Sequence, residues 1–390
     1  MFEKKIKLIP YGKQCINDAD IEAVVHALRD EYLTQGPKIE EFEKAFASYV
    51  GVSYALAVSN GTTALHLCAL ALKVNETTRV ITTPITFVAS ANCILYCGGT
   101  VDLCDVNPSS FLLDLDKLEK KLASNPKGFY SGIVAVDFAG YPVDLERLRK
   151  IADANSLWII EDACHSPGGF FLNSSNKIEK CGNGKHADLA VFSFHPVKHI
   201  TTGEGGMITT NSLELYNKLK LLRTHGITRE KNRLKEDHGG WYYEMQELGY
   251  NYRLTDFQSA LGISQLKHAT DRLNVRKEIA KKYWSFFKDK DYIITQSGYV
   301  VGHAYHLYII LTKGRLELYN YLKNKSIYCQ VHYIPIHLMP YYQTLGWKTG
   351  DFPNAEYYYE HCLSLPMFPT LSDDEQQFVM ATINEHFSHD

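Results

Sequence analysis

Short apolar runs alternate with longer helix-like segments through the first two thirds of the chain. Most of these runs are continuously apolar, which is typical of strands that are covered on both faces. Repetition of strand, helix and strand predicts a mostly parallel sheet with helices on both sides. The predicted strands are residues 54–59, 79–83, 100–106, 132–138, 157–163, 187–194 and 205–210, and a predicted helix over 61–72 follows the first of them.

The pattern changes after about residue 249. Residues 254–289 form one long amphipathic stretch that predicts helix. Beyond it, residues 304–311 and 326–334 are rich in aromatic and β-branched residues and are predicted as strands of a smaller sheet. The C-terminal part is therefore expected to form a separate α+β unit.

The chain has 390 residues, which is long for one hydrophobic core. We place a large α/β domain at residues 1–249 and a smaller C-terminal α+β domain at residues 250–390, and residues 1–16 can pack onto the smaller one. Apolar residues make up 45% of the chain and charged residues 22%, as in ordinary globular proteins.

The net charge and the lack of targeting signals argue against a nucleic-acid-binding protein and against a membrane protein. Lys and Arg number 41 against 44 Asp and Glu, so the net charge is −3 and no basic excess indicates a general nucleic-acid binder. The first residues lack an apolar core of signal-peptide length, and no apolar stretch reaches the roughly 20 residues that span a bilayer. We therefore expect a cytoplasmic protein with neither a nucleic acid nor a membrane as partner.

The nine cysteines are odd in number and scattered, several of them within apolar runs. This distribution is typical of buried, reduced thiols. The spacing of Cys93, Cys97 and Cys104 matches no standard zinc pattern, and no pair of histidines completes one. We predict no metal site.

Two polar side chains stand where predicted strands end, and ligands of open parallel sheets bind at such ends. A lone Asp162 would more often cap a helix, but it could also pair with a protonated ring nitrogen. Lys198 lies between an apolar run and a glycine-rich turn. Its ammonium could simply reach the surface, yet a desolvated lysine has a lowered pKa and can form a Schiff base with an aldehyde.

A lysine and an acidic partner for a pyridine nitrogen are the pair that pyridoxal phosphate requires. Gly61 and Thr62 begin a predicted helix, where backbone N–H groups favour a phosphate dianion, and Ser193 could add a hydroxyl. Phe87 could stack on the ring, and His165 could reach its phenolic oxygen or stack beside it. Each of these residues, taken alone, would more often cap a helix or pack in the core than bind a cofactor.

Five segments, in this order over nearly the whole chain, resemble the nucleotide-sugar aminotransferases of the DegT/DnrJ/EryC1/StrS family. They are SNGTTALHL, TPITFVASAN, EDACHSPGG, FSFHPVKHITTGEGGMITTN and GYNYRLTDFQSALG, and the fourth is the most specific. The resemblance implies a fold type I homodimer, similar to aspartate aminotransferase, that uses pyridoxal 5′-phosphate. It also implies that Lys198 forms the Schiff base, Asp162 pairs with the ring nitrogen and Phe87 stacks on the ring.

The same resemblance implies that Gly61, Thr62 and Ser193 hold the cofactor phosphate. Asn251 would reach the phosphate in the other subunit, which places each site at the dimer interface. Many members of the family have Gln where His165 stands, although His occurs in the pseudaminic acid branch.

Within the family, the chain looks most like the pseudaminic acid branch. This implies that glutamate gives its amino group, leaving 2-oxoglutarate, to C4 of a UDP-linked 4-keto-6-deoxy-N-acetylhexosamine. Another nucleotide keto-sugar, aminated at C3 or C4, is the alternative. The candidate substrate contacts are Tyr11, Leu33, Thr34, His332, Tyr333 and His337. For each aromatic one, core packing is nearly as common an explanation.

Three competing functions remain. Sugar dehydratases of the same fold replace the Schiff-base lysine with histidine, whereas this chain keeps Lys198. Non-catalytic cofactor-binding regulators generally carry a DNA-binding domain or lose the lysine, and neither feature is seen. A purely structural dimer would not need Asp162, Lys198 and a phosphate cradle together. The sequence therefore predicts an enzyme.

Overall fold

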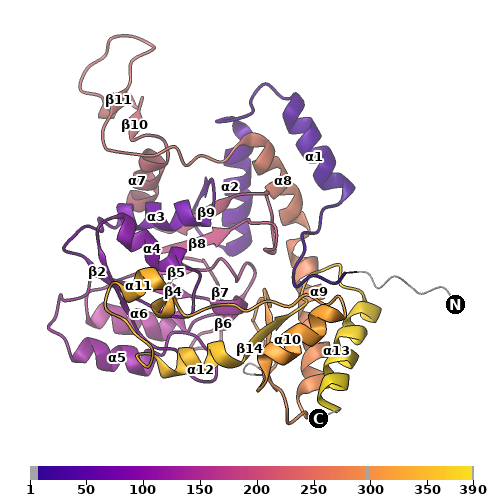
Figure 1. Ribbon diagram of the computed structural model, residues 1–390. Helices are drawn as coiled ribbons and strands as arrows, with labels where there is room; N and C mark the ends of the chain where they lie inside the picture. The colour runs from indigo at the N-terminus through magenta and orange to yellow at the C-terminus, as the bar shows by residue number, and fades with distance from the viewer. Residues whose placement is uncertain (1–7, 296–297, 389–390) are drawn as a thin grey trace.

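The structure is a computed structural model that describes residues 8–295 and 298–388. A seven-stranded sheet of order β1-β9-β8-β5-β4-β2-β3 forms its centre (Figure 1). The strands are β1 (Tyr54–Val58), β2 (Arg79–Thr82), β3 (Thr100–Leu103), β4 (Gly132–Val136), β5 (Trp158–Asp162), β8 (Leu189–Ser193) and β9 (Gly206–Thr210). All seven predicted strands are present.

Only β9 runs against its neighbours in this sheet, and the pairs among β8, β5, β4, β2 and β3 are parallel. Because β1 is antiparallel to β9, it points the same way as the others. Six strands therefore end at one edge of the sheet, which confirms the predicted mostly parallel α/β architecture.

Helices cover both faces of this sheet, as the continuously apolar strands predict. Alternate residues point to opposite faces: Val134 packs with α3, α4 and α7, whereas Ile133 packs with α5 and α6. A further cluster joins Phe192 to α2. The helices of this unit are α1 (Asp18–Arg29), α2 (Pro37–Val50), α3 (Gly61–Ala71), α4 (Ala89–Tyr96), α5 (Leu115–Ala123), α6 (Leu145–Ala154), α7 (Leu213–Arg223) and α8 (Asp256–Lys267).

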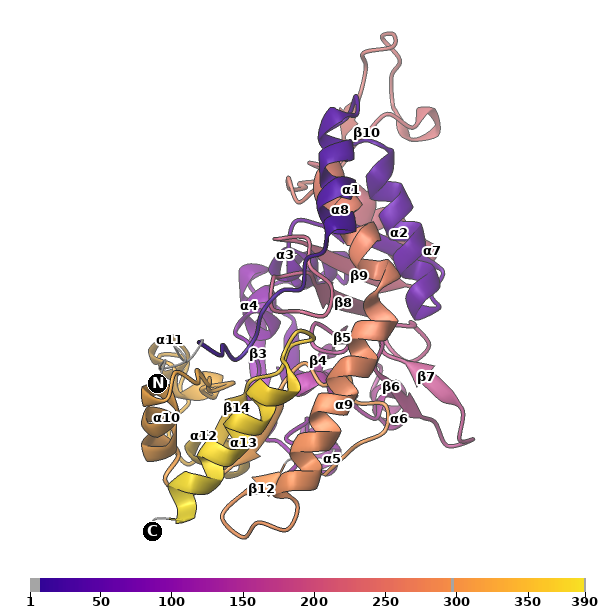
Figure 2. The ribbon, with the colours of Figure 1, turned by 90° about the vertical axis from the view of Figure 1, so that its right-hand side faces the viewer.

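Short elements decorate this unit. They are the hairpin β6 (Phe170–Leu172) with β7 (Ile178–Lys180), the hairpin β10 (Ile227–Thr228) with β11 (Glu244–Met245), and the 3-10 turns η1 (Phe138–Gly140) and η2 (Lys231–Arg233). The segment between β10 and β11 projects away from the body of the molecule in both views (Figures 1 and 2).

The C-terminal part builds a smaller unit on an antiparallel three-stranded sheet. Two C-terminal elements, η3 (Ile336–Leu338) and α11 (Pro340–Gln343), pack instead with α3 and α4 of the large unit. The elements of the smaller unit are α9 (Ala269–Phe287), β12 (Ile294–Thr295), β13 (Tyr308–Leu311), α10 (Arg315–Asn324), α12 (Pro353–His361), β14 (Cys362–Leu365) and α13 (Asp373–Ser388). Ile9 lies in the core of this unit and forms a parallel bridge with Ile327, so the first described residues pack here. Of the described helices, none is long and apolar enough to cross a membrane.

Two expectations about the C-terminal part need correction. The predicted helix over 254–289 is two helices, which meet at His268. The predicted strand over 326–334 is wrong: the segment makes one bridge to Ile9 on one side and one to Ser364 on the other. With a single bridge on each side, no ladder forms there, and β14 pairs with β13 instead.

The boundary at 249/250 stays a prediction. In space, α8 packs against α1 and α2, whereas α9 extends from α8 along the smaller unit beside α13 (Figure 2). The two units are thus joined by the pair α8 and α9.

Candidate active site

A cavity of about 480 Å³ lies at the edge where the parallel strands end. Its walls come from the start of α3, the ends of β5 and β8, and the segment before η3. Most of the predicted site residues line it: Tyr11, Gly61, Thr62, Phe87, Asp162, His165, Ser193, Lys198, His332 and Tyr333. Side chains predicted for the cofactor and for the substrate therefore meet in one space.

Lys198 lies in the connection that leaves β8. Its backbone N–H donates to the carbonyl of His195 at 2.9 Å, and the N–H of Thr202 donates to the carbonyl of Phe194 at 3.0 Å, which closes the loop. Burial lowers the pKa of the Lys198 amine to about 8, although the nearby Cys164 and Asp162 act in the opposite direction. The neutral, nucleophilic amine is thus far more accessible near neutral pH than in a surface lysine.

Asp162 is the last residue of β5 and is only 6% exposed. The hydroxyl of Ser90 donates to its Oδ2 at 2.6 Å, and the N–H of Cys164 donates to its Oδ1 at 3.2 Å. The Ser90 hydroxyl in turn lies 2.7 Å from that of Thr86. These contacts fix the orientation of a carboxylate that faces the cavity.

The turn from β1 into α3 has the form of a phosphate cradle. Asn60 caps α3 by accepting from the N–H of Thr63 at 2.8 Å, while the N–H groups of Gly61 and Thr62 meet no acceptor within the described residues. A Cβ added to Gly61 would lie 3.1 Å from that of Ser193, and one added to Gly206 would lie 2.6 Å from the carbonyl of Asn60. The close approach of these backbones gathers two free N–H groups and a hydroxyl at a helix N-terminus, which suits a phosphate dianion.

His165 follows β5 and lies between two other aromatic side chains. The N–H of Ala139 donates to its Nδ1 at 3.2 Å, and its Nε2 lies 3.2 Å from the hydroxyl of Tyr333. The ring centre of His306 is 4.3 Å away. Burial, together with the charge of Lys198, lowers the pKa of His165 well below its usual value, so the ring is neutral.

The smaller unit closes the cavity on the opposite side from the sheet. The rings of Tyr11 and His332 lie 5.3 Å apart, and the Nδ1 of His332 lies 2.9 Å from the hydroxyl of Ser364. The ring of Tyr333 lies 6.1 Å from that of Phe87. Tyr333 therefore stands where the two sides of the cavity meet.

Four predicted residues do not line the cavity of their own chain. His337 is fully buried and contacts Glu356 at 2.9 Å. Thr34 bridges Thr255, and Asn251 bridges Thr224. The fourth is Leu33, which is 49% exposed and accepts from the N–H of Asp256 at 3.0 Å. Leu33 and Thr34 thus contact the start of α8, and Asn251 contacts the end of α7.

Several residues of the site were not identified from the sequence: four line the cavity, and Ser90 supports Asp162 without lining it. Ser90 and Thr86 belong to the segment that contains Phe87, and no local signal sets them apart from ordinary helix-start hydroxyls. His306 comes just before β13, and Cys164 and Glu204 lie inside motifs that were identified for other residues. Only the folded arrangement brings them to the site.

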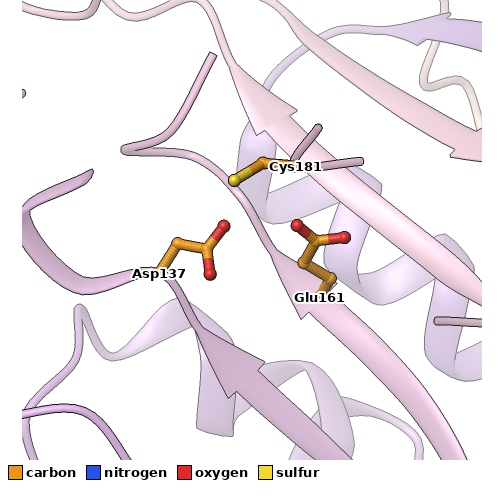
Figure 3. Close-up of side chains that lie close together, drawn as sticks. All are labelled: Asp137, Glu161 and Cys181. Atoms are coloured by element: carbon orange, nitrogen blue, oxygen red, sulfur yellow. The ribbon is translucent and has the colours of Figure 1, made fainter. Parts of the chain in front are cut away.

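A buried carboxyl pair lies beside the site, on the other face of β5. Figure 3 shows the side chains of Asp137, Glu161 and Cys181, whose possible ligand atoms all lie within 4.8 Å of one another. The carboxylate of Asp137 accepts from the N–H of Val143 and from Ser166, and that of Glu161 accepts from the N–H of Gly182. Both carboxylates are thus already bonded to the chain, which favours a pair that shares a proton over a metal centre.

The pair predicts an unusual pH dependence of stability. Burial raises the pKa of Asp137, and burial with the charge of Asp137 raises that of Glu161, so the folded state binds protons more tightly than the unfolded one. The stabilisation is complete at acidic pH, below the usual carboxyl range, and is lost as the pH rises through the raised values. We expect Glu161→Gln to flatten the fall in the free energy of unfolding between pH 5 and 8, measured in urea.

The matched control is Glu119→Gln, which removes a carboxylate from a surface ion pair with Arg147. It should leave the slope of the free energy of unfolding against pH as in the wild type. Parallel slopes for wild type and Glu161→Gln would contradict the shared proton.

The comparison with known proteins bears on this geometry. The model of the DegT/DnrJ/EryC1/StrS aminotransferase family matches residues 14–384. A UDP-4-amino-4,6-dideoxy-N-acetyl-beta-L-altrosamine transaminase of Campylobacter jejuni is 38% identical over 384 residues, which cover 96% of each chain.

Solved structures show the same fold. Helicobacter pylori PseC, an aminotransferase of pseudaminic acid biosynthesis, aligns with a TM-score of 0.88 at 33% identity over 98% of this chain and 100% of its own. Spr1654 of Streptococcus pneumoniae, assigned as a sugar aminotransferase, has been solved in PLP and PMP forms; the PLP form aligns with a TM-score of 0.88 at 28% identity over 98% of this chain and 99% of its own. The predicted fold type I is confirmed. The chain therefore belongs to the DegT/DnrJ/EryC1/StrS aminotransferase family and is a sugar aminotransferase that depends on pyridoxal 5′-phosphate.

Proposed function

We propose that the enzyme transfers the amino group of glutamate to C4 of a UDP-linked 4-keto-6-deoxy-N-acetylhexosamine. The observation that carries the chemistry is the placement of a desolvated amine, Lys198, and a buried carboxylate, Asp162, in one cavity beside a phosphate cradle. The choice of sugar follows the relatives of Campylobacter jejuni and Helicobacter pylori that are named as altrosamine transaminases.

The cavity fits pyridoxal phosphate on three counts. The free N–H groups at the start of α3 and the hydroxyl of Ser193 would hold its phosphate, Asp162 would bind its ring nitrogen, and Phe87 would cover its ring. When bound, the cofactor supplies an aldehyde that takes up amino groups and a ring that accepts electrons.

The side chains then divide the proton transfers between them. The Lys198 amine, with its pKa lowered to about 8, removes the α-proton of the amino donor and later returns a proton, acting as general base and then general acid. Asp162, held by Ser90, keeps a proton on the ring nitrogen of the cofactor. The smaller unit covers these groups and keeps bulk water from the Lys198 amine.

A homodimer with shared sites is part of the proposal. Asn251, Leu33 and Thr34 do not line their own cavity, so they are free to contribute to the cavity of a second copy. Exposed apolar side chains lie near them in sequence, with Tyr32 54% and Leu248 76% exposed. A second copy would cover such side chains.

The test is a pair of half-reactions on the holoenzyme. Glutamate alone should remove the visible absorbance of the lysine-bound cofactor, and the UDP-linked 4-keto sugar should then restore it. A GDP-linked 4-keto sugar is the informative comparison, because a GDP-perosamine synthase of Escherichia coli is 32% identical to this chain. Faster recovery with the GDP sugar would overturn the proposed acceptor, and no response to glutamate would overturn the proposed donor.

A further inference from the structure

Tyr333 occupies a junction in the cavity. One neighbour is Phe87, on the side of the residues that fit the cofactor, and another is His332 on the side of the smaller unit, whose ring in turn lies 5.3 Å from that of Tyr11. A ligand atom beside Tyr333 would therefore lie where cofactor and substrate meet.

The protonation of His165 decides which group donates in the hydrogen bond between His165 and Tyr333. A backbone N–H can only donate, so the Nδ1 of His165 must accept from Ala139. A neutral imidazole carries one proton, which is then on Nε2. This Nε2–H donates to the hydroxyl oxygen of Tyr333 across 3.2 Å.

Both groups stay in these protonation states near neutral pH. Burial and the charges of Lys198, His332 and His199 lower the pKa of His165, so a second proton does not enter the ring. Burial, followed by the charge of Asp162, raises the pKa of Tyr333, so the phenol keeps its proton.

The proton of the Tyr333 hydroxyl is left without an acceptor. Its oxygen accepts from His165, and within residues 8–295 and 298–388 no group accepts from it. Because Tyr333 lines the cavity, this O–H is available to a ligand oxygen there.

The turn that holds His165 is built at a conformational cost. Ala139 has φ of 60°, in the left-handed region that a residue with a Cβ rarely adopts. Gly140 has φ of 95°, and a Cβ there would lie 2.8 Å from the carbonyl of His165. The carboxylate of Asp137 holds this turn next to His165. It accepts from the N–H of Val143, after the turn, and from the hydroxyl of Ser166, the residue after His165.

We propose that Tyr333 donates a hydrogen bond to the keto oxygen of the acceptor sugar, and that His165 and Ala139 are positioning residues that direct this donor into the cavity. The assignment rests on the proposed function. When an amine adds to the carbonyl carbon, a C–N bond forms, the C=O double bond opens and negative charge grows on the oxygen. The two protons of the amine nitrogen then pass to this oxygen, which leaves as water as the C=N bond forms. A fixed donor that meets this oxygen stabilises the charge as it develops.

The sugar oxygen fits better than an oxygen of the cofactor. Tyr333 comes from the segment that carries His332 and lies on the smaller unit, whereas the residues that fit the cofactor come from the edge of the large sheet. Tyr333→Phe should therefore slow one half-reaction only. We expect the return of the amino group to the keto sugar to fall about 100-fold, and the reaction with glutamate to change less than about 3-fold.

The matched control is Tyr342→Phe, which removes a hydroxyl that donates to Asn92 outside the cavity. It should leave both half-reactions at the wild-type rate, measured with whichever keto sugar restores the wild-type absorbance. Equal slowing of both half-reactions in Tyr333→Phe would assign the hydroxyl to the cofactor and overturn the proposal, as would no slowing at all.

A second measurement needs no substrate, so it separates this inference from the proposed function. The ¹⁵N shifts of labelled histidine should show His165 neutral with its proton on Nε2 in the holoenzyme. In Tyr333→Phe, the Nε2–H signal should move upfield as its hydrogen bond is lost. A proton on Nδ1 would reverse the direction of the bond and overturn the proposal.

Discussion

Replacing Lys198 by Ala is expected to abolish transamination, with a loss of more than about 10⁴-fold in the rate of amino transfer. Two contributions disappear at once: the amine that binds the cofactor aldehyde covalently, and the base that removes the α-proton. Nothing else in the described part of the cavity replaces it, because the neighbouring His199 is turned away and bonds to the carbonyl of Ala304. The measurement is the glutamate half-reaction, followed by absorbance.

Two further variants test whether the loss of activity in Lys198→Ala is due to the missing amine. Lys198→Arg keeps a positive charge but offers no amine of comparable nucleophilicity, so it should be as inactive as Lys198→Ala. Lys185→Ala removes an exposed lysine that pairs with Glu179 outside the cavity and should leave the rate unchanged. Retained turnover in Lys198→Ala would contradict the assignment.

The second largest effect is expected for Asp162→Asn. The amide has nearly the same shape as the carboxylate, so the cofactor should still attach to Lys198, but the ring nitrogen loses its anionic partner. We expect the glutamate half-reaction to slow by roughly 10²–10³-fold, as when one preorganised electrostatic contact is removed. Stopped-flow absorbance of the holoenzyme measures this rate.

Asp105→Asn is the matched control. Asp105 is a buried carboxylate that pairs with Lys117 and caps the start of α12, away from the cavity. Its loss should lower the midpoint of thermal unfolding but leave the half-reaction intact. A variant Asp162→Asn that reacts at the wild-type rate would show that the carboxylate serves the fold and not the cofactor.

The sheet could be predicted because its signals are local. Each strand is a short apolar run buried on both faces, and the period of two along β5 separates Ile160 on one face from Glu161 on the other. The same alternation explains why Asp162 reaches the cavity while its neighbour Glu161 joins the buried pair with Asp137. The sequence predicted the first placement from the strand end but contained no signal for the second.

The contacts that complete the site are long-range. Ser90 and Asp162 are 72 residues apart, and His165 and Tyr333 are 168 apart, so no spacing in the sequence connects them. His337 is the opposite case, a residue that the sequence predicted for the site and that the fold places elsewhere. It lies in the segment expected to bind substrate, yet its side chain turns inward to Glu356.

The segment over 326–334 failed as a strand prediction for a related reason. Its alternating aromatic and β-branched residues suit a strand, but its two sides meet different partners, Ile9 and Ser364, at one residue each. Its last residues then turn toward the cavity, which both His332 and Tyr333 line, and His332 contacts β14 through the hydroxyl of Ser364. The local pattern is compatible with a strand, but the tertiary contacts of the segment prevent a ladder.

The most direct test of the central claim is to locate the cofactor by reductive trapping. Borohydride reduction of the holoenzyme fixes the bond between the cofactor and its lysine, and peptide mass spectrometry identifies that lysine. We predict that the label is found on Lys198 alone, in the peptide that follows β8. A label on another lysine, or none despite bound cofactor, would contradict the account of this cavity as the site of amino transfer.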